Sequence, residues 1–336
     1  MAVFNPELYA GNIITSRIRL ARNLKDMPFS LDEKNAKDVV KKVNRALVKT
    51  DTFNLYFVSN LDEITLEAMK ERHLISQNLI DNNVSGAALI NPDESLSIMV
   101  NEEDVIREQC FMKGLMLTEA YKRLDAIDDE LAKNLDIAFD ENLGYLTACP
   151  TNLGTGMRAS VMLFLPALTE SGKIEGLIDE VSELGLTVRG LYGEGSRAEG
   201  CMYQISNEIT LGISEYDIIK SVEEAVLSIC RVERELEEKL YVKRELITMD
   251  KAKKAYGVLT NAVLLPYSEF LSLIAKVKLG SMLGMINISD TQALDELTVA
   301  VRPANLCVQY GRPLGDTDRD LFRAELVGKK LMKLKE

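Results

Sequence analysis

Arginines recur at positions from which their guanidinium groups could meet in one site. Arg17 and Arg19 stand two residues apart in "TSRIRLARN", so in an extended segment both project from one face, and Ile18 faces the other way. Arg107 follows a run of carboxylates, Arg158 follows a glycine-rich turn, and Arg189 lies within a strand-like segment. Arginine makes bidentate contacts to phosphate oxygens and stays charged at any working pH. Together the five could hold a polyphosphate with magnesium, although a single such arginine is more often a surface ion-pair partner.

The stretch "TACPTNLGTGMR" (147–158) is rich in turn-forming residues, which argue against a continued helix or strand. Gly154 and Gly156 let the backbone approach a neighbour closely, and Arg158 adds a fixed positive charge. The stretch is therefore a candidate site. Its thiol, Cys149, is a candidate reactive group, although a lone cysteine is more often buried and inert.

Carboxylates form a second group of candidate residues. "VNEEDV" (100–105) ends an apolar strand with three of them, and Glu194 lies in a second glycine-rich turn, "LYGEGSRAEG". Such residues could receive a cationic substrate or bind magnesium, and otherwise they are solvated. The only histidine, His73, is expected on a helix and partly buried. A mechanism built on a histidine base, or a histidine-rich metal site, is therefore nearly excluded.

Composition narrows the class of protein. The chain has 336 residues, 46% of them hydrophobic, which is enough for a core and for two domains. The net charge of −12 makes general nucleic-acid binding a poor prospect; it suits basic partners, or it serves only solubility. Five cysteines without C-x-x-C spacing, no secretory signal and no run long enough to span a bilayer favour a cytoplasmic protein. Neither a P-loop nor a Rossmann glycine motif is present.

The expected elements mix helices and strands before about residue 240 and are nearly all helical after about 245. Helices are expected near 31–49, 62–80, 104–134, 158–170, 174–184 and 215–240, and strands at 54–60, 86–90, 95–101, 144–149, 186–192 and 201–209. "NPDE" (91–94) predicts a hairpin turn between two of these strands. We therefore expect an α+β body over residues 1–245 and a helical C-terminal domain over residues 246–336.

Several segments together resemble the phosphagen kinase (ATP:guanidino phosphotransferase) family. They are "SRIRLARN", "NEED" followed by Arg107, "CPTNLGTGMRASV" and "VRGLYGEGS", and they occur in the family's order. The chain is most similar to the bacterial protein-arginine kinase branch (McsB type). It lacks the long N-terminal helical domain of metazoan relatives, and "GRPLGDTDRDLFRAELV" resembles that branch's phosphoarginine-binding element. The resemblance runs from about residue 12 to residue 330.

The resemblance implies an antiparallel sheet flanked by helices, and transfer of the γ-phosphoryl group of Mg-ATP to arginine side chains of proteins, marking them for regulated degradation or a stress response. It implies a homodimer and, as partners, protein substrates, a zinc-binding activator protein and a Clp-type protease. The implied catalytic residues are Glu103, Glu194 and Cys149, the last contacting the guanidinium as a thiolate. The implied ATP-binding residues are Arg17, Arg19, Arg107, Arg158 and Arg189. The implied allosteric phosphoarginine site is Arg319, Asp320 and Arg323.

Three positions depart from the family pattern. Val105 follows "NEED" where a histidine is common, Phe164 stands where a helical histidine would lie against adenine, and Arg197 replaces an expected acidic residue. Phenylalanine can still stack on a base. Two alternatives stay open: a kinase for free arginine or another small guanidino compound, and a non-catalytic phosphoarginine-binding adaptor. The C-terminal element could also be only a capped helix that begins near Asp316 or Thr317.

Overall fold

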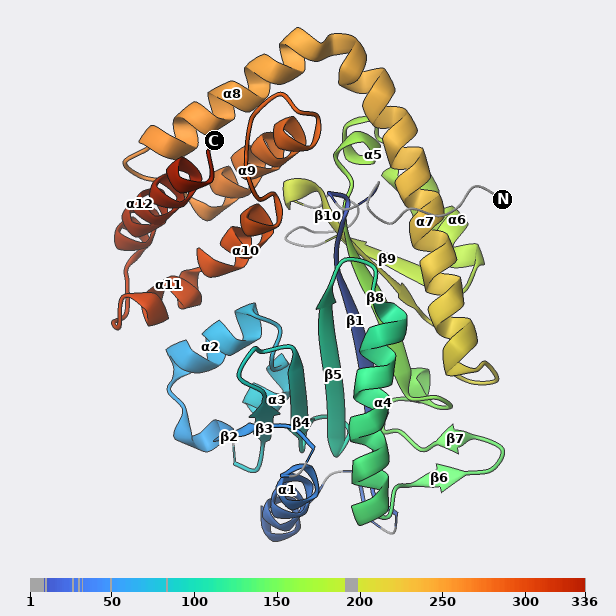
Figure 1. Ribbon diagram of the computed structural model, residues 1–336. Helices are drawn as coiled ribbons and strands as arrows, with labels where there is room; N and C mark the ends of the chain where they lie inside the picture. The colour runs from blue at the N-terminus through green and yellow to red at the C-terminus, as the bar shows by residue number, and fades with distance from the viewer. Residues whose placement is uncertain are drawn as a thin grey trace.

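An antiparallel sheet forms the centre of the structure. The computed structural model describes residue 9 and residues 11–25, 27–29, 31, 33–48, 50–82, 84–190 and 199–335. Within them the main sheet has eight strands in the order β2-β3-β4-β5-β1-β8-β10-β9 (Figure 1). These are β1 (Ile13–Arg22), β2 (Asn54–Phe57), β3 (Ala87–Ile90), β4 (Leu96–Val100), β5 (Ile106–Lys113), β8 (Met157–Phe164), β9 (Leu186–Gly190) and β10 (Met202–Asn207). A small hairpin, β6 (Phe139–Asp140) and β7 (Gly144–Tyr145), stands apart from the sheet.

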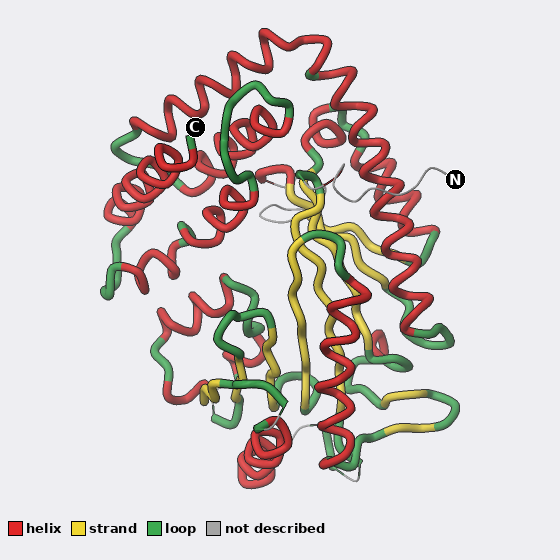
Figure 2. Tube along the Cα trace, in the orientation of Figure 1, coloured by secondary structure: helices red, strands yellow, loops and turns green. Residues whose placement is uncertain are grey.

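Helices surround the sheet and then continue beyond it. Those of the strand-containing part are α1 (Glu33–Leu47), α2 (Glu63–Glu71), α3 (Gln77–Asp81), α4 (Leu117–Asn134), α5 (Pro166–Glu170), α6 (Ile174–Glu183) and α7 (Glu215–Leu240). The C-terminal part contains α8 (Glu245–Asn261), α9 (Tyr267–Met282), α10 (Gln292–Ala300), α11 (Pro303–Gln309) and α12 (Asp316–Leu334). Figure 2 shows strands only in the first part, and helices and loops in the second.

The alternation of β1 decides which face of the sheet is apolar. Ile18 and Leu20 are almost fully buried in a core that includes Leu124 of α4 and Val222 of α7. Because successive side chains of a strand point to opposite faces, Arg17 and the other odd-numbered positions face away from these helices. Figure 1 shows α4 and α7 running along the sheet. One face of the sheet is therefore core, and the other can carry charge.

The second face is only partly covered. Ala88, Ile90 and Met99 of β3 and β4 pack against the segment of α2 and α3, including Leu66 and Leu79. The C-terminal helices form a separate core of their own, to which α8, α9, α10 and α12 all contribute. Over β5, β1, β8, β10 and β9, residues of the second face line cavities instead.

The α+β class, the antiparallel sheet and the helical C-terminal part confirm the expected fold class. The hairpin at 91–94 is also confirmed, since β3 and β4 pair antiparallel across it. The first part of the helix expected over 158–170 is wrong, because 157–164 forms β8, and only its last part is helical, as α5. The first part of the helix expected over 104–134 is also wrong, because 106–113 forms β5. Both are inner strands of the sheet with long buried stretches, so their apolar residues do not show the simple alternation that identifies a half-exposed strand.

Within the described residues, no helix combines the length and the apolar character needed to cross a membrane.

A buried ion pair joins the main helix of the core to the end of β1. The Arg22 guanidinium contacts both carboxylate oxygens of Asp128 on α4, with Nε–Oδ1 at 3.0 Å and Nη2–Oδ2 at 2.8 Å. Its Nη1 donates to the backbone oxygen of Thr155 at 3.0 Å, and the guanidinium lies 3.4 Å from the ring centroid of Tyr145. The pair therefore ties α4, β1 and the glycine-rich turn together.

Replacing Asp128 with Ala should lower the free energy of unfolding by about 3–5 kcal/mol, because Arg22 would stay buried without its counter-charge. Urea denaturation at pH 7 measures this. The matched control is Glu130→Ala on the same helix, since the Glu130–Lys133 pair is much more exposed and should cost less than about 1 kcal/mol. Similar losses in the two variants would contradict the expectation.

Candidate active site

The five predicted arginines lie on the second face of the sheet, opposite the core helices α4 and α7. Arg107 comes from β5, Arg17 and Arg19 from β1, Arg158 from β8 and Arg189 from β9. The Cα atoms of Arg19 and Arg158 are direct partners in the β1–β8 register. A cavity of about 340 Å³ is lined by all five arginines together with Glu103, Cys149 and Asn152. Four strands of one rigid sheet thus bring together residues that are as much as 172 positions apart in the chain.

Burial and mutual repulsion strain the charges of this arginine cluster. Burial lowers the pKa of Arg17, and Arg107 and Arg158 lower it further. Burial followed by the neighbouring guanidinium groups lowers the pKa of Arg19 in the same way. Neither Arg17 Nε nor Arg19 Nε has a hydrogen-bond partner within the described residues. An anion with several oxygens would offset both the repulsion and the missing hydrogen bonds.

The three consecutive carboxylates of "NEED" have three different surroundings. Glu102 accepts from Arg107 at 2.7 Å and from the Ser76 hydroxyl at 2.5 Å. Burial acts to raise the pKa of Glu102, but the charge and hydrogen bond of Arg107, together with the hydrogen bond from Ser76, lower it overall. Glu103 is exposed and lines the cavity. Asp104 is buried and belongs to the scaffold described next. Glu103 and Asp104 both line the cavity, and Glu103 is the exposed one of the two.

Asp104 connects the acidic loop, "NEED" (101–104), to the cysteine turn, "TACPTNLGTGMR" (147–158). Its Oδ1 accepts from Asn23 Nδ2 at 2.7 Å and from the backbone N–H of Ala148 at 2.7 Å. The Asn23 side-chain oxygen in turn accepts from the backbone N–H of Val105 at 2.9 Å. The carboxylate of Asp104 therefore fixes Glu103 and Cys149 relative to each other.

The glycines of the cysteine turn make room for the protein's own backbone. Gly154 has a φ of 111°, and a Cβ there would collide with the backbone oxygen of Thr210. At Gly156, with a φ of 63°, a Cβ would lie 2.6 Å from the backbone oxygen of Ala21. The sequence predicted that a neighbouring group approaches these glycines closely. The structure shows that this group is the protein's own backbone. The turn places the Cys149 thiol 3.0 Å from Thr151 Oγ1 at the cavity wall.

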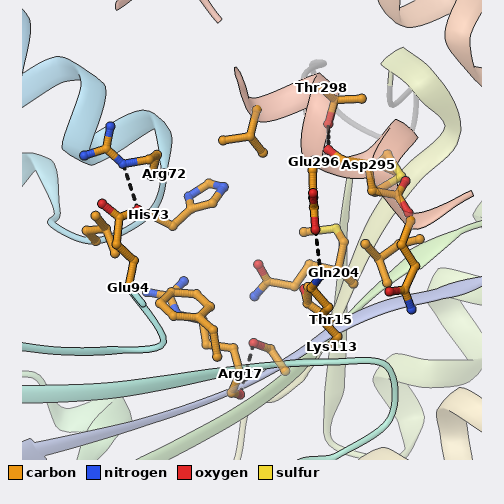
Figure 3. A pocket seen from close by; sticks show the side chains of 18 residues that line it. Thr15, Arg17, Arg72, His73, Glu94, Lys113, Gln204, Asp295, Glu296 and Thr298 are labelled. Carbon is orange, nitrogen blue, oxygen red and sulfur yellow. Dashed lines mark hydrogen bonds and ion pairs between the residues drawn. The ribbon is translucent and has the colours of Figure 1, made fainter. Parts of the chain in front are cut away.

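A second, more apolar cavity of about 290 Å³ adjoins the first, and Arg17 and Gln204 line both. Figure 3 shows this second cavity, with His73 on one side and Glu296 of α10 on the other. Its walls include the side chains of Leu74, Phe111, Met162, Met202 and Val299. The C-terminal helices therefore contribute one wall of a cavity that opens next to the arginine cluster.

His73 stays neutral at this cavity. Burial, followed by the charges of Arg17 and Arg302, lowers the pKa of His73 to about 3. Its backbone φ is 63°, so it is not in a regular helix as the sequence suggested but in the turn after α2.

Two of the departures from the family pattern have structural explanations. Val105 is buried in a core cluster with Ile98 and Ile106, so its side chain does not enter the cavity. Phe164 lies on the strand β8 and not on a helix, and it lines neither of the two cavities. Met162, two positions earlier, lines the apolar cavity instead. The expected helical position of Phe164 is therefore wrong, and its stacking on a base stays a prediction. Glu194 and Arg197 lie outside the described residues.

The predicted phosphoarginine residues lie on α12, in the C-terminal part and away from the arginine cluster. Arg323 is buried and donates to the backbone oxygens of Val301 at 3.0 Å and Leu265 at 2.8 Å, and to Asp320 Oδ1 at 2.7 Å. Arg319 pairs with the carboxylate of Asp316. The helix does begin at Asp316, but its N-cap is Gly315, which offers no side-chain hydrogen bond. Arg323 thus holds helices together, while Arg319 and Asp320 are partly exposed.

The sequence did not single out Asn23, Gln109 and Ser206 as supporting residues, and it grouped Asp104 with carboxylates that could bind a ligand. Asp104, Asn23 and Gln109 are buried, and Ser206 accepts a hydrogen bond from Arg158 Nη2 at 2.9 Å. Gln109 follows Arg107 by two positions on β5, the same spacing as Arg17 and Arg19. That spacing was the available signal for Gln109.

Comparisons with known proteins agree with this geometry. Residues 34–236 match the ATP:guanido phosphotransferase C-terminal catalytic domain, and residues 245–336 match the protein-arginine kinase McsB C-terminal domain. A protein named protein-arginine kinase from Caldanaerobacter subterraneus subsp. tengcongensis is 44% identical over 328 residues, which cover 96% of this chain and 97% of that protein. Another of that name, from Clostridium kluyveri, is 46% identical over 327 residues, covering 96% and 95%.

A solved structure shares the fold. The duplicated taurocyamine kinase from Schistosoma mansoni with bound transition state analog components matches with a TM-score of 0.63 and 27% identity. The match covers 71% of this chain and 35% of that chain.

The arginine cluster should bind tripolyphosphate, and Arg19→Met should remove most of that binding. Bound at about a hundred times its Kd, the anion should stabilise the protein by about 2.7 kcal/mol, seen as a higher Tm. Without the anion, R19M should melt no lower than the unsubstituted protein, because it loses a buried, repelled charge. Arg231→Met, at an exposed position of α7, is the matched control and should keep the full response. An unchanged response in R19M would contradict the assignment.

His73 should make the protein less stable in acid. Its pKa of about 3 lies below the unfolded value near 6.5, so the unfolded state binds more protons between these pH values. Stability is therefore lost as the pH falls below 6.5, by about 1.4 kcal/mol per pH unit from this group. His73→Asn suits the positive φ and removes the titrating imidazole. Between pH 6.5 and 5, urea denaturation should show a loss smaller by about 2 kcal/mol in H73N; equal losses would refute a depressed pKa.

Proposed function

The chain belongs to the ATP:guanido phosphotransferase family, and we propose that it is a protein-arginine kinase, which transfers the γ-phosphoryl group of ATP to the guanidinium of arginine side chains in proteins. The observation that carries this proposal is the single cavity in which five guanidinium groups meet an exposed carboxylate, Glu103, and a thiol, Cys149. The guanidinium groups suit a triphosphate, and the carboxylate and the thiol suit a cationic acceptor. The names of the relatives supply the substrate class.

The arginine cluster would bind the phosphates, and the adjoining apolar cavity would bind the nucleoside. Arg17 and Gln204 line both cavities, so they stand where the two parts of ATP would join. Two of the three carboxylates of "NEED" already have partners in the protein, since Glu102 is paired with Arg107 and Asp104 accepts from Ala148. This fits Mg²⁺, which keeps several waters and is bound largely by substrate phosphates. When bound with ATP it would supply positive charge between the phosphate oxygens.

Phosphorylation of a substrate arginine needs a base. An arginine guanidinium has a pKa far above neutral pH and is protonated there, so it is a poor nucleophile until a proton leaves. Glu103 would orient this group and accept its proton as the N–P bond forms and the bond from the γ-phosphorus to the bridging oxygen breaks, which releases ADP. Cys149, as a thiolate, would stabilise the cation while it binds. Glu194 is proposed as the second carboxylate. The arginine cluster would neutralise the triphosphate and hold the γ-phosphorus in line with the attacking nitrogen.

We also propose the wider organisation that the sequence suggested. Residues 1–245 would form the catalytic domain and residues 246–336 a helical domain that mediates homodimer formation, with exposed Leu246 and Val263 at its surface. Arg319, Asp320 and Arg323 would form an allosteric phosphoarginine site. A cytoplasmic location, a zinc-binding activator protein and a Clp-type protease complete the proposal.

A phosphotransfer assay tests the function. The purified protein is incubated with Mg-ATP and an arginine-rich protein, and in parallel with Mg-ATP and free arginine, and acid-labile phosphate is mapped by mass spectrometry. Phosphate on protein arginines supports the proposal. Transfer to free arginine alone would replace it with a small-guanidino kinase, and ATP binding without transfer in either reaction, also with the activator added, would replace it with an adaptor.

Two adjacent glutamates should have separable kinetic effects. Glu103→Gln should lower kcat by about 10²–10⁴-fold with little change in the Kd for Mg-ATP, because it removes the proton acceptor. Glu102→Gln, the matched control, should instead change the Kd for Mg-ATP, because it releases the Arg107 guanidinium. Initial rates at saturating ATP, together with calorimetric titration, measure both. A near-normal kcat in E103Q would remove Glu103 from the mechanism.

A further inference from the structure

Hydrogen bonds fix the orientation of the Gln109 side-chain amide. It is fully buried on β5, on the same strand face as Arg107. Its Nε2 donates to the backbone oxygens of His73 and Leu74, each at 2.9 Å. Its Oε1 accepts from Arg17 Nη2. Because both amide hydrogens point at carbonyl oxygens, only the amide oxygen can face Arg17.

Arg17 is held from two sides by this strand. Gln109 binds Nη2, and the Phe111 ring lies 5.0 Å from the guanidinium carbon. A guanidinium has five N–H donors, and Arg17 Nε has no partner within the described residues. The contacts with β5 therefore fix the direction of the group and leave donors for a ligand in the two cavities that Arg17 lines.

The carbonyls that orient Gln109 come from a constrained turn. His73 has a φ of 63°, an uncommon conformation for this residue that surrounding contacts must maintain. Ser97 Oγ donates to the Leu74 carbonyl at 2.6 Å, so this oxygen accepts from two side chains. The turn is thus pinned to the sheet by Gln109 and Ser97.

The same turn is tied to the C-terminal helices. The Glu71 carboxylate accepts from the backbone N–H groups of Ala304 at 3.0 Å and Asn305 at 2.9 Å, at the start of α11. The Arg72 guanidinium donates to Asn305 Oδ1 at 2.9 Å. A continuous set of hydrogen bonds therefore runs from α11 through residues 71–74 and Gln109 to Arg17.

We propose that Gln109 is a positioning residue that directs Arg17 toward the phosphates of ATP and links it to the junction of α2 and α11, so that the C-terminal helices influence nucleotide affinity. This rests on the proposed assignment of the arginine cluster to the phosphates. The competing explanation is that Gln109 only satisfies two buried carbonyls of the turn, in which case its loss would change stability and leave ATP affinity alone.

The test is calorimetric titration of the full chain with Mg-ATP in the absence of an arginine substrate. Gln109→Leu should raise the Kd about tenfold, because Arg17 loses the contact that directs it. In kinetic assays at saturating ATP, the KM for the protein substrate should stay within twofold. Ser97→Ala is the matched control: it removes a hydrogen bond to the same Leu74 carbonyl without touching Arg17, and its Kd should stay within twofold.

A double-mutant cycle tests the link to α11. Glu71→Gln weakens the contact with Ala304 and Asn305 and should raise the Kd for Mg-ATP about threefold in the unsubstituted protein. In the Q109L background it should have almost no further effect, because the connection to Arg17 is already broken. Equal effects of E71Q in both backgrounds would overturn the link.

A Kd for Q109L within twofold of the unsubstituted protein would overturn the positioning role. If Q109L proves unfolded by circular dichroism, Gln109→Glu replaces it. This variant keeps an acceptor for Arg17 but loses both donors to the carbonyls, and its carboxylate competes with phosphate, so its Kd should also rise at least tenfold. Because the readout is ATP binding, a protein that binds ATP normally but phosphorylates no arginine would refute the proposed function and leave this inference standing.

Discussion

Repulsion among guanidinium groups on one face of a buried sheet is the constraint on which the rest of the structure depends. Arg17 and Arg19 lose solvation and lie close to further positive charges, which is why their pKa values are lowered. Such an arrangement persists only if the strands that carry it cannot move apart. The opposite face supplies this rigidity, because Ile18 and Leu20 are packed against the core helices α4 and α7. The apolar half of each strand thus stabilises the charged half.

The three consecutive carboxylates of "NEED" have different functions because their surroundings differ. In "NEED" the first glutamate neutralises Arg107, the second is exposed to the cavity, and the aspartate holds the cysteine turn through Ala148. Burial decides the difference, since a buried carboxylate must be paired and an exposed one need not be. The chemistry proposed for Glu103 and Cys149 therefore relies on Asp104, whose carboxylate is engaged by Asn23 and Ala148.

The two cavities also connect parts of the chain that are far apart in sequence. Residues of α10 form one wall of the apolar cavity, and the start of α11 bonds to Glu71 at the end of α2. A change in the position of the C-terminal helices would therefore alter both the shape of the proposed nucleoside site and the hydrogen bonds behind Arg17. The fold thus places the helical part beside the proposed nucleotide site without supplying any residue of the arginine cluster.

The amino-acid sequence by itself determined the residue types of the site, the α+β class and the helical C-terminal part, because these depend on local spacing and on motif order. Arg17 and Arg19 show this, since two-residue spacing on a strand is enough to put both on one face. The inner strands β5 and β8 were misread in part because burial on both faces removes the alternation that marks a strand. The position of Phe164 was misjudged for the same reason.

Only the tertiary structure decided which polar residues support the site. Gln109, Asp104 and Asn23 act through partners that lie 35, 44 and 81 positions away, and no local pattern encodes such contacts. It also decided that the glycines of the cysteine turn face the protein's own backbone, and that Arg323 is occupied by carbonyls of Val301 and Leu265. These outcomes depend on how distant segments pack, which is a property of the folded chain and not of any single stretch.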